Sequence, residues 1–182
     1  MNKNTFKSVL LCTVFFCMAS GIQVKAQSTL ADAIIFSKNE QYDKAEALFQ
    51  QLIKGEPGNS KLYFYYGENT LLNYFADTIS NSLTVAAKEA GDLFNKGVSA
   101  NAVEPLNYVG LAKIAFFQGN DAKAEELRVK AKSLLPPYKK VTKIANPKDY
   151  AFTLAKIAES YIRYDQVDSS KAMPYIREAL LI

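Results

Sequence analysis

Residues 105–137 read PLNYVGLAKIAFFQGNDAKAEELRVKAKSLLPP, a pattern that predicts one helical hairpin. Pro105 stands where a helix accepts proline, at its first residue. Gly119-Asn120 predicts a turn, after which Asp121 can cap a second helix. Pro136-Pro137 ends that helix because proline cannot continue it. The segment therefore predicts two antiparallel helices joined by a short turn.

The same helix–turn–helix pattern recurs on both sides of this segment. Apolar residues fall at helical spacing over 30–53, on either side of a polar turn, and Gly55-Glu56-Pro57-Gly58 ends the second helix. Further helix pairs are expected at 60–74 with 85–98, and at 148–164 with 170–181. The alternating pattern of half-buried strands appears nowhere convincingly. The chain is therefore predicted to be all-α.

Small residues recur at a fixed interval along these hairpins. A spacing of 34 residues separates Ala33 from Gly67, and the same spacing separates Ala90 from Ala124. Small side chains let two helices approach closely, and larger residues one turn away fill the neighbouring gaps. A helix–turn–helix unit that repeats at this period indicates an array of stacked hairpins.

In these features the chain resembles the tetratricopeptide repeat (TPR) family. The first copy carries the resemblance in Ala33, Phe36, Tyr42, Ala45, Phe49, Ile53 and Pro57. The third carries it in Tyr108, Leu111, Ala112, Gly119, Ala124, Ala131 and Pro136. The resemblance implies a right-handed α-solenoid of about four TPR-like hairpins over residues 27–182. The alternative is an unrelated α-helical bundle.

The chain departs from the family pattern in three places. About eleven extra residues fall around 75–80, in the second hairpin, and about a dozen fall between the third and fourth hairpins. Arg128 stands where the family usually has an aromatic residue.

Residues 1–26 have the pattern of a secretory signal peptide. Lys3, Lys7 and Lys25 are present without any acidic residue, and the apolar run VLLCTVFFCMA occupies residues 9–19. Small residues follow, so we expect cleavage after Ala26; an uncleaved membrane anchor is the alternative. The predicted location is the periplasm or the outer-membrane surface, with no transmembrane segment after cleavage. The Ala26–Gln27 junction resembles exported proteins of the Bacteroidetes.

The amino-acid composition limits the catalytic and metal-binding groups available in residues 27–182. The sequence has no His, and both cysteines, Cys12 and Cys17, lie within residues 1–26. Residues 27–182 therefore lack the imidazole and thiol groups of common nucleophiles and metal sites. Thr153 and Lys156 have the spacing of a nucleophile and its base, but are interpreted as a solvent-facing pair. We expect no enzyme activity, no cofactor and no metal site.

The TPR resemblance implies that a protein or peptide partner binds in a concave groove lined by the first helix of each hairpin. The groove residues that it implies are Lys61, Phe64, Glu68, Lys113, Phe116, Lys156, Glu159 and Arg163. Charged and aromatic residues together suit an extended peptide. The alternative for Phe64 and Phe116 is that both rings belong to the core.

A basic segment and a short loop are further candidate sites. The basic segment contains no acidic residue, and its cations are Arg128, Lys130, Lys132, Lys139, Lys140, Lys143 and Lys148. It is either a docking site for an acidic protein, anionic lipid or polysaccharide, or a solvated linker. Export and a formal charge of +1 over residues 27–182 argue against nucleic acid. The loop Asp77-Thr78-Ile79 resembles the O-glycosylation signal of the Bacteroidetes, with Thr78 as the acceptor.

The sequence thus predicts a non-catalytic protein–protein interaction scaffold of the cell envelope. One alternative is an assembly arm of a larger multidomain outer-membrane-associated protein, of which this chain is the N-terminal part. The run Leu180-Leu181-Ile182 favours it, since an uncapped array exposes an apolar face. The other alternative is a subunit that binds glycan or another envelope component.

Overall fold

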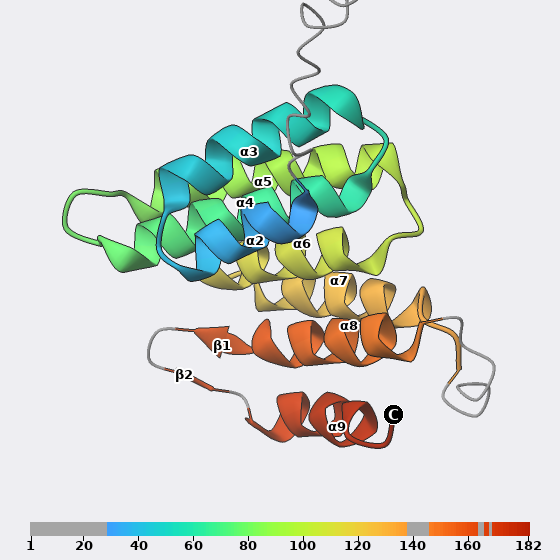
Figure 1. The fold of residues 1–182 in the computed structure, drawn as a ribbon. Helices are drawn as coiled ribbons and strands as arrows, with labels where there is room; N and C mark the ends of the chain where they lie inside the picture. The colour runs from blue at the N-terminus through green and yellow to red at the C-terminus, as the bar shows by residue number, and fades with distance from the viewer. Residues whose placement is uncertain (1–28, 138–145, 164–165, 168) are drawn as a thin grey trace, which may run out of the picture.

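The protein is described here from a computed structural model that covers residues 29–137, 146–163, 166–167 and 169–182. The predicted signal peptide, with its cleavage site, and Lys139, Lys140 and Lys143 of the basic segment lie outside the described residues. Within these ranges the chain forms helices joined by short turns, and one pair of short strands (Figure 1).

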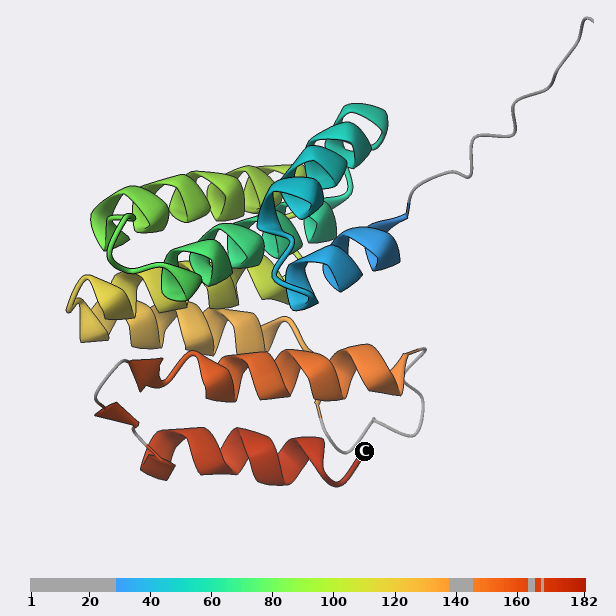
Figure 2. The same ribbon diagram turned by 60° about the vertical axis from the view of Figure 1, so that its left-hand side comes forward.

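The helices pack as successive antiparallel pairs: α2 with α3, α4 with α5, α6 with α7, and α8 with α9 (Figures 1 and 2). Their bounds are α2 Leu30–Lys38, α3 Tyr42–Gly55, α4 Ser60–Ala76, α5 Leu83–Ala100, α6 Pro105–Phe117, α7 Asp121–Ser133, α8 Pro147–Glu159 and α9 Ser169–Ala179. The pairs stack from α2 and α3 at one end to α9 at the other. Across the described residues, the predicted array of stacked helical hairpins is confirmed.

One expected helix is shorter than its apolar pattern predicts. The sequence indicates a helix over 148–164, but α8 ends at Glu159, and Ser160 caps its last turn. The chain then forms β1 (Ile162–Arg163), which pairs antiparallel with β2 (Gln166–Val167). Backbone groups that would have continued the helix bond across this small hairpin instead. The all-α class is therefore confirmed for the described residues, with this pair of two-residue strands as a local departure.

A second difference concerns the start of α7. Asp121 was expected to cap this helix, but it is the first helical residue, and Asn120 is the cap. The Asn120 side chain accepts a hydrogen bond of 3.1 Å from the Lys123 backbone N–H. Asp121 then lies in the first turn, where a carboxylate is favourable beside the positive end of the helix dipole.

Small residues lie at the closest helix contacts, as their spacing predicts. Ala33 and Ala45 are fully buried between α2 and α3, and Ala112 and Ala124 are fully buried in α6 and α7. In the middle of the array, a Cβ added to Gly67 of α4 would lie 2.4 Å from the Phe94 ring of α5. The missing side chain therefore makes the space that this ring fills.

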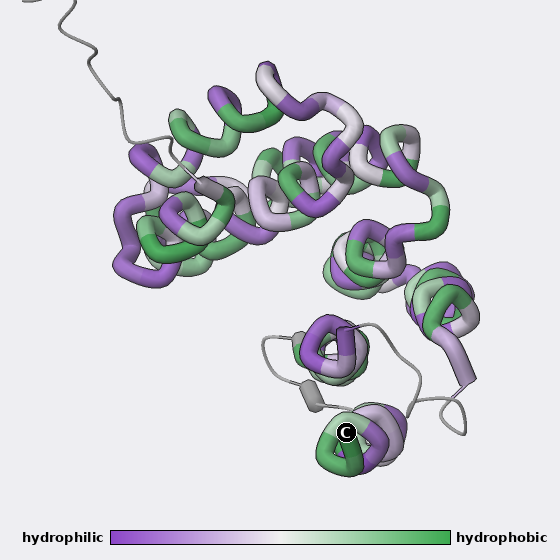
Figure 3. Tube along the Cα trace, turned by 45° about the vertical axis from the view of Figure 1, so that its right-hand side comes forward, coloured by the Kyte–Doolittle hydropathy of each residue, from purple (hydrophilic) through white to green (hydrophobic). Residues whose placement is uncertain are grey.

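The far end of the array is apolar on its outer side. Figure 3 shows hydrophobic residues at the end of the chain, beyond α9. Leu180 is 80% exposed and Leu181 67% exposed. These residues thus have the exposure that the sequence predicts for them.

Candidate binding site

Helices α4 and α8 lie close enough to form direct contacts although α6 separates them in the array. Lys61 Nζ of α4 lies 2.7 Å from Asp149 Oδ2 of α8, a pair separated by 88 residues in the chain. One turn further on, the rings of Tyr65 and Phe152 stack with their centroids 6.2 Å apart. The second and fourth hairpins therefore meet across the third. We call the side formed by α4, α6 and α8 the inner face.

A cluster of four charged side chains, here called the charge cluster, continues these contacts. Lys113 Nζ of α6 lies 2.9 and 3.1 Å from the two carboxylate oxygens of Glu68 and 2.6 Å from Glu159 Oε1. Lys156 Nζ lies 2.8 Å from Glu68 Oε2 and 2.8 Å from Glu159 Oε2. Two ammonium groups and two carboxylates thus balance one another between α4, α6 and α8.

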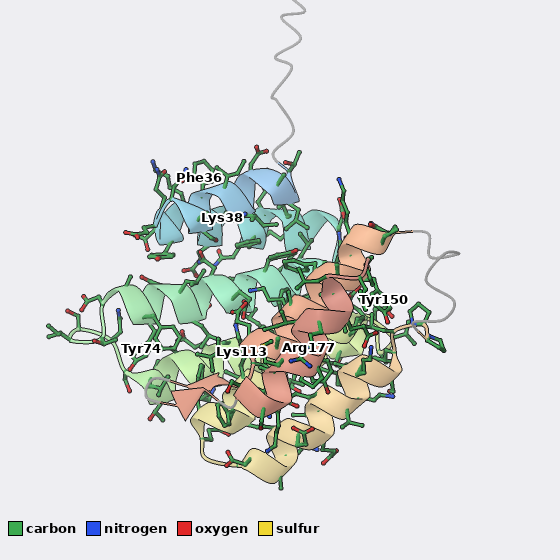
Figure 4. All side chains as sticks on the ribbon, turned by 90° about the horizontal axis from the view of Figure 1, so that it is seen from below. Phe36, Lys38, Tyr74, Lys113, Tyr150 and Arg177 are labelled. Atoms are coloured by element: carbon green, nitrogen blue, oxygen red, sulfur yellow. The ribbon has the colours of Figure 1, made fainter. Side chains whose placement is uncertain are left out.

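The centre of the charge cluster is buried. Glu68 is 8% exposed and Lys113 is 9% exposed, and Figure 4 places Lys113 in the interior of the helix array. Burial by itself would raise the pKa of Glu68, but the ammonium groups of Lys113 and Lys156 lower it to about 2. Burial opposes the charge of Lys156, but the carboxylates of Glu68 and Glu159 together raise its pKa. Glu68 and Lys156 are therefore held in their charged forms.

The charge cluster predicts a specific loss of stability in acid. A folded-state pKa below the ordinary value of 4.5 stabilises the protein above about pH 5, and this contribution is lost as the pH falls toward 2. Between pH 6 and 2, we expect wild type to lose about 3 kcal/mol more free energy of unfolding than Glu68→Gln. Urea unfolding across this pH range measures the difference. Glu89→Gln, at an exposed position of α5, controls for the loss of one charge. Parallel pH profiles for wild type and Glu68→Gln would contradict the prediction.

The inner face brings together most of the predicted groove residues. Five of the eight form ion pairs with one another or with Asp149: Lys61, Glu68, Lys113, Lys156 and Glu159. Phe64 and Phe116 are buried in hydrophobic clusters, so for these two rings the core alternative holds. Arg163 lies in β1, and its side chain is outside the described part of the structure.

Arg128 is part of the packing between α7 and α8 and does not belong to an exposed basic surface. It is 2% exposed, and its guanidinium carbon lies 3.8 Å from the centroid of the Tyr161 ring and 5.0 Å from that of Phe116. Nε donates to Ser160 Oγ at 2.9 Å, and Nη2 donates to the Ser160 carbonyl at the end of α8. The guanidinium thus packs against two aromatic rings and also caps α8.

We expect Arg128→Lys to lower the free energy of unfolding by about 2 kcal/mol. A lysine lacks the planar group that packs between two rings, and it cannot satisfy both Ser160 oxygens in the same geometry. Arg177→Lys on α9 is the matched control, because Arg177 is exposed; a change within about 0.5 kcal/mol is expected there. Chemical denaturation of both variants checks the prediction, and equal effects would contradict it.

The rest of the basic segment is divided among several environments. Lys132 pairs with Glu178 of α9, and Lys130 Nζ lies 5.8 Å from the centroid of the Tyr108 ring. Lys148 is exposed in the first turn of α8. Arg128, Lys130 and Lys132 all lie on α7, so the segment does not form one continuous basic loop.

A cavity of about 230 Å³ opens where α4, α6 and α8 begin. Its charged residues are Lys61 of α4, Glu104 at the cap of α6 and Asp149 of α8. Tyr65 and Phe152 supply aromatic walls, and further apolar lining comes from Pro105, Leu106, Leu135 and Pro136. Figure 4 shows Tyr150, another lining residue, at the side where α8 begins. Three successive hairpins thus contribute to one cavity.

Sequence reasoning missed most of this cavity. Lys61, Tyr65 and Glu68 are spaced to share one side of α4, and Asp149, Phe152 and Lys156 are spaced to share one side of α8. These two stripes, each with charged and aromatic side chains, were the sequence pattern from which the cavity could have been predicted. That the stripes face each other depends on how the hairpins stack, which neither stripe specifies.

Within the described residues, Thr153 and Lys156 do not form a nucleophile and base pair. Thr153 is buried rather than solvent-facing, and its hydroxyl donates to the Asp149 carbonyl at 2.8 Å, while Lys156 pairs with Glu68 and Glu159. In the described ranges no group of three or more His, Cys, Asp or Glu residues could hold a metal ion. No helix in those ranges is sufficiently long and apolar to span a bilayer.

Thr78 lies on the exposed loop between α4 and α5. Asp77 Oδ1 accepts hydrogen bonds from the backbone N–H groups of Ile79 at 3.1 Å and Ser80 at 3.0 Å, so this carboxylate holds the turn. The Thr78 side chain is accessible there, and its glycosylation stays a prediction.

The fold and the inner face define the class of protein: an array of stacked helical hairpins whose alternate helices share one side. No family model matches the chain, and no curated protein matches it. Among solved structures, one described as the crystal structure of MamA is similar, with a TM-score of 0.35. Its sequence identity is 17%, over 85% of this chain and 94% of that chain. At that TM-score the similarity supports no conclusion about the fold or the function of this chain.

Proposed function

We propose that this protein is a non-catalytic interaction module that binds a protein or peptide partner where α4, α6 and α8 begin. The observation that carries the proposal is the cavity shared by these three helices, because a bound segment there contacts three successive hairpins at once. Its mixture of aromatic, apolar and charged lining residues suits a peptide segment. Further along the inner face, the charge cluster occupies the space between α4 and α8.

The proposed place of action is the cell envelope, in the periplasm or at the outer-membrane surface. The signal-peptide pattern of residues 1–26 supports this location. Native protein whose sequence begins at Gln27 is the expected result of N-terminal analysis. A native chain that retains residues 1–26 would contradict the cleavage.

A role as an assembly arm is the second candidate function. The exposed apolar residues on α9 and beyond it, which include Met173, Leu180 and Leu181, favour this role. In a hairpin array the next element would cover such a surface.

Site-specific photocrosslinking tests the proposed binding site. A photoreactive amino acid at Pro136, an exposed position on the cavity rim, is compared with one at Glu89, an exposed position on α5. In envelope extract we expect Pro136 to capture a discrete partner, which excess unlabelled protein removes by competition. We expect Glu89 to capture at least tenfold less of that partner. Equal capture from both positions would contradict the assignment of the binding site.

A further inference from the structure

The cavity where α4, α6 and α8 begin contains a carboxylate that lacks a cationic partner within the described residues. Lys61 is paired with Asp149 at 2.7 Å. The Glu104 carboxylate forms no ion pair with the described residues, and it accepts one hydrogen bond, from the Leu106 backbone N–H at 3.4 Å. The three charged lining residues together carry one excess negative charge. The described lining of the cavity is therefore complementary to a cation.

The surroundings of Glu104 make this carboxylate costly to leave without a partner. Partial burial raises its pKa, and the neighbouring charge of Asp149 acts in the same direction. The Leu106 N–H and the more distant charge of Lys61 oppose this effect only in part. A cation placed against Glu104 would compensate for the water that its carboxylate has lost.

The walls of the cavity select among cations. Tyr65 and Phe152 offer aromatic surface, and Leu106 and Leu135 offer aliphatic surface. A lysine ammonium is compact and strongly hydrated, so it gains little from such walls. An arginine guanidinium is planar and more weakly hydrated, stacks on aromatic rings and can form two hydrogen bonds to one carboxylate.

From this geometry, and on the basis of the proposed function, we propose that the cavity binds an arginine side chain of the partner segment. Glu104 pairs with the guanidinium, and Tyr65 and Phe152 contact its faces or its aliphatic stem. Asp149 adds favourable charge while it remains paired with Lys61. An acidic partner side chain would instead meet two carboxylates in this cavity.

A matched pair of short peptides tests this inference. The probes are acetyl-Ala-Arg-Ala-amide and the same peptide with citrulline, which keeps the shape of arginine but is neutral. Each is titrated into the purified protein while the backbone NMR signals of Leu106 and Leu135 are followed. We expect the arginine peptide to shift both signals with saturation. The citrulline peptide should bind at least tenfold more weakly.

Two variants test whether the Glu104 carboxylate is responsible for binding of the arginine peptide. Glu104→Gln should weaken binding of the arginine peptide at least tenfold, and its amide oxygen can still accept the Leu106 N–H, so that α6 remains capped. An unchanged thermal midpoint checks the fold of the variant. Glu89→Gln removes a charge at an exposed position of α5 and should leave the affinity unchanged.

Several outcomes would overturn the inference. These are equal affinity for the two peptides, unchanged binding in Glu104→Gln, and no shift of the cavity signals with the arginine peptide. If Pro136 still captures a partner while the peptide test fails, the proposed function stands and the arginine assignment does not. If Pro136 captures no more than Glu89, it is the proposed function that is contradicted.

Discussion

Gly67→Ala is expected to destabilise the protein by about 3 kcal/mol, although alanine is normally the better helix residue. The added Cβ would lie 2.4 Å from Cε1 of Phe94, within the ring of a fully buried side chain. The ring cannot move away freely, because Gly110 of α6 lies against it as well, with its own added Cβ at 2.6 Å. Phe94 therefore fills a space that two glycines on neighbouring helices make together.

A matched glycine and a compensating change make this prediction specific. Gly91→Ala on α5 introduces the same methyl group at a helical glycine, but the nearest atom is 3.8 Å away, on Ile114. This variant should be neutral or gain up to about 1 kcal/mol. Phe94→Leu should remove much of the clash in the Gly67→Ala background. Urea denaturation measures all of these variants, and equal effects at Gly67 and Gly91 would contradict the account.

Removal of the central carboxylate of the charge cluster should have a comparably large effect. We expect Glu68→Leu to lower the free energy of unfolding by about 3–5 kcal/mol. The variant leaves Lys113 and Lys156 to share Glu159, with one positive charge in excess between α4, α6 and α8. The cost comes mainly from a buried ammonium group without sufficient compensation.

The double variant Glu68→Leu/Lys113→Met separates the effect of charge from that of lost packing. It restores neutrality, because Lys156 and Glu159 remain paired at 2.8 Å. Buried ion pairs often tolerate replacement by apolar residues of similar volume, so the double variant should be more stable than Glu68→Leu alone. Guanidinium chloride would screen the charges, so urea is the suitable denaturant. If the destabilisation of the double variant equals the sum of those of Glu68→Leu and Lys113→Met measured singly, the charge cluster is not a coupled unit.

The hairpins could be predicted from sequence because their signals are local. Gly119-Asn120 and Pro136-Pro137 interrupt helical periodicity on either side of α7, and the turn and the helix end lie where these residues indicate. Small residues at the 34-residue interval likewise lie in the closest contacts between helices. Each of these features depends on residues within one hairpin or its neighbour.

The site was harder to predict because its contacts join distant hairpins. Lys61 and Asp149 are 88 residues apart. The family resemblance indicated Lys61 as a groove residue, but Asp149 taken alone has the pattern of an ordinary charge on a solvated helix. Arg128 was misleading for a related reason. Its cationic neighbours in sequence suggested a basic surface, but the rings of Phe116 and Tyr161 and the oxygens of Ser160 enclose it. Partners of this kind become visible only once the helices are stacked.

Zero-length carbodiimide crosslinking with mass spectrometry tests most directly whether the second and fourth hairpins meet across the third. The reagent joins an amine to a carboxylate only where the two are in contact, and the local ion pairs Lys88–Asp92 and Lys123–Glu126 serve as internal standards. We predict a crosslink from Lys61 to Asp149 in monomeric protein, at a yield comparable to those standards, because both side chains are accessible to the reagent. Recovery of the two local crosslinks without the Lys61–Asp149 crosslink would contradict the account.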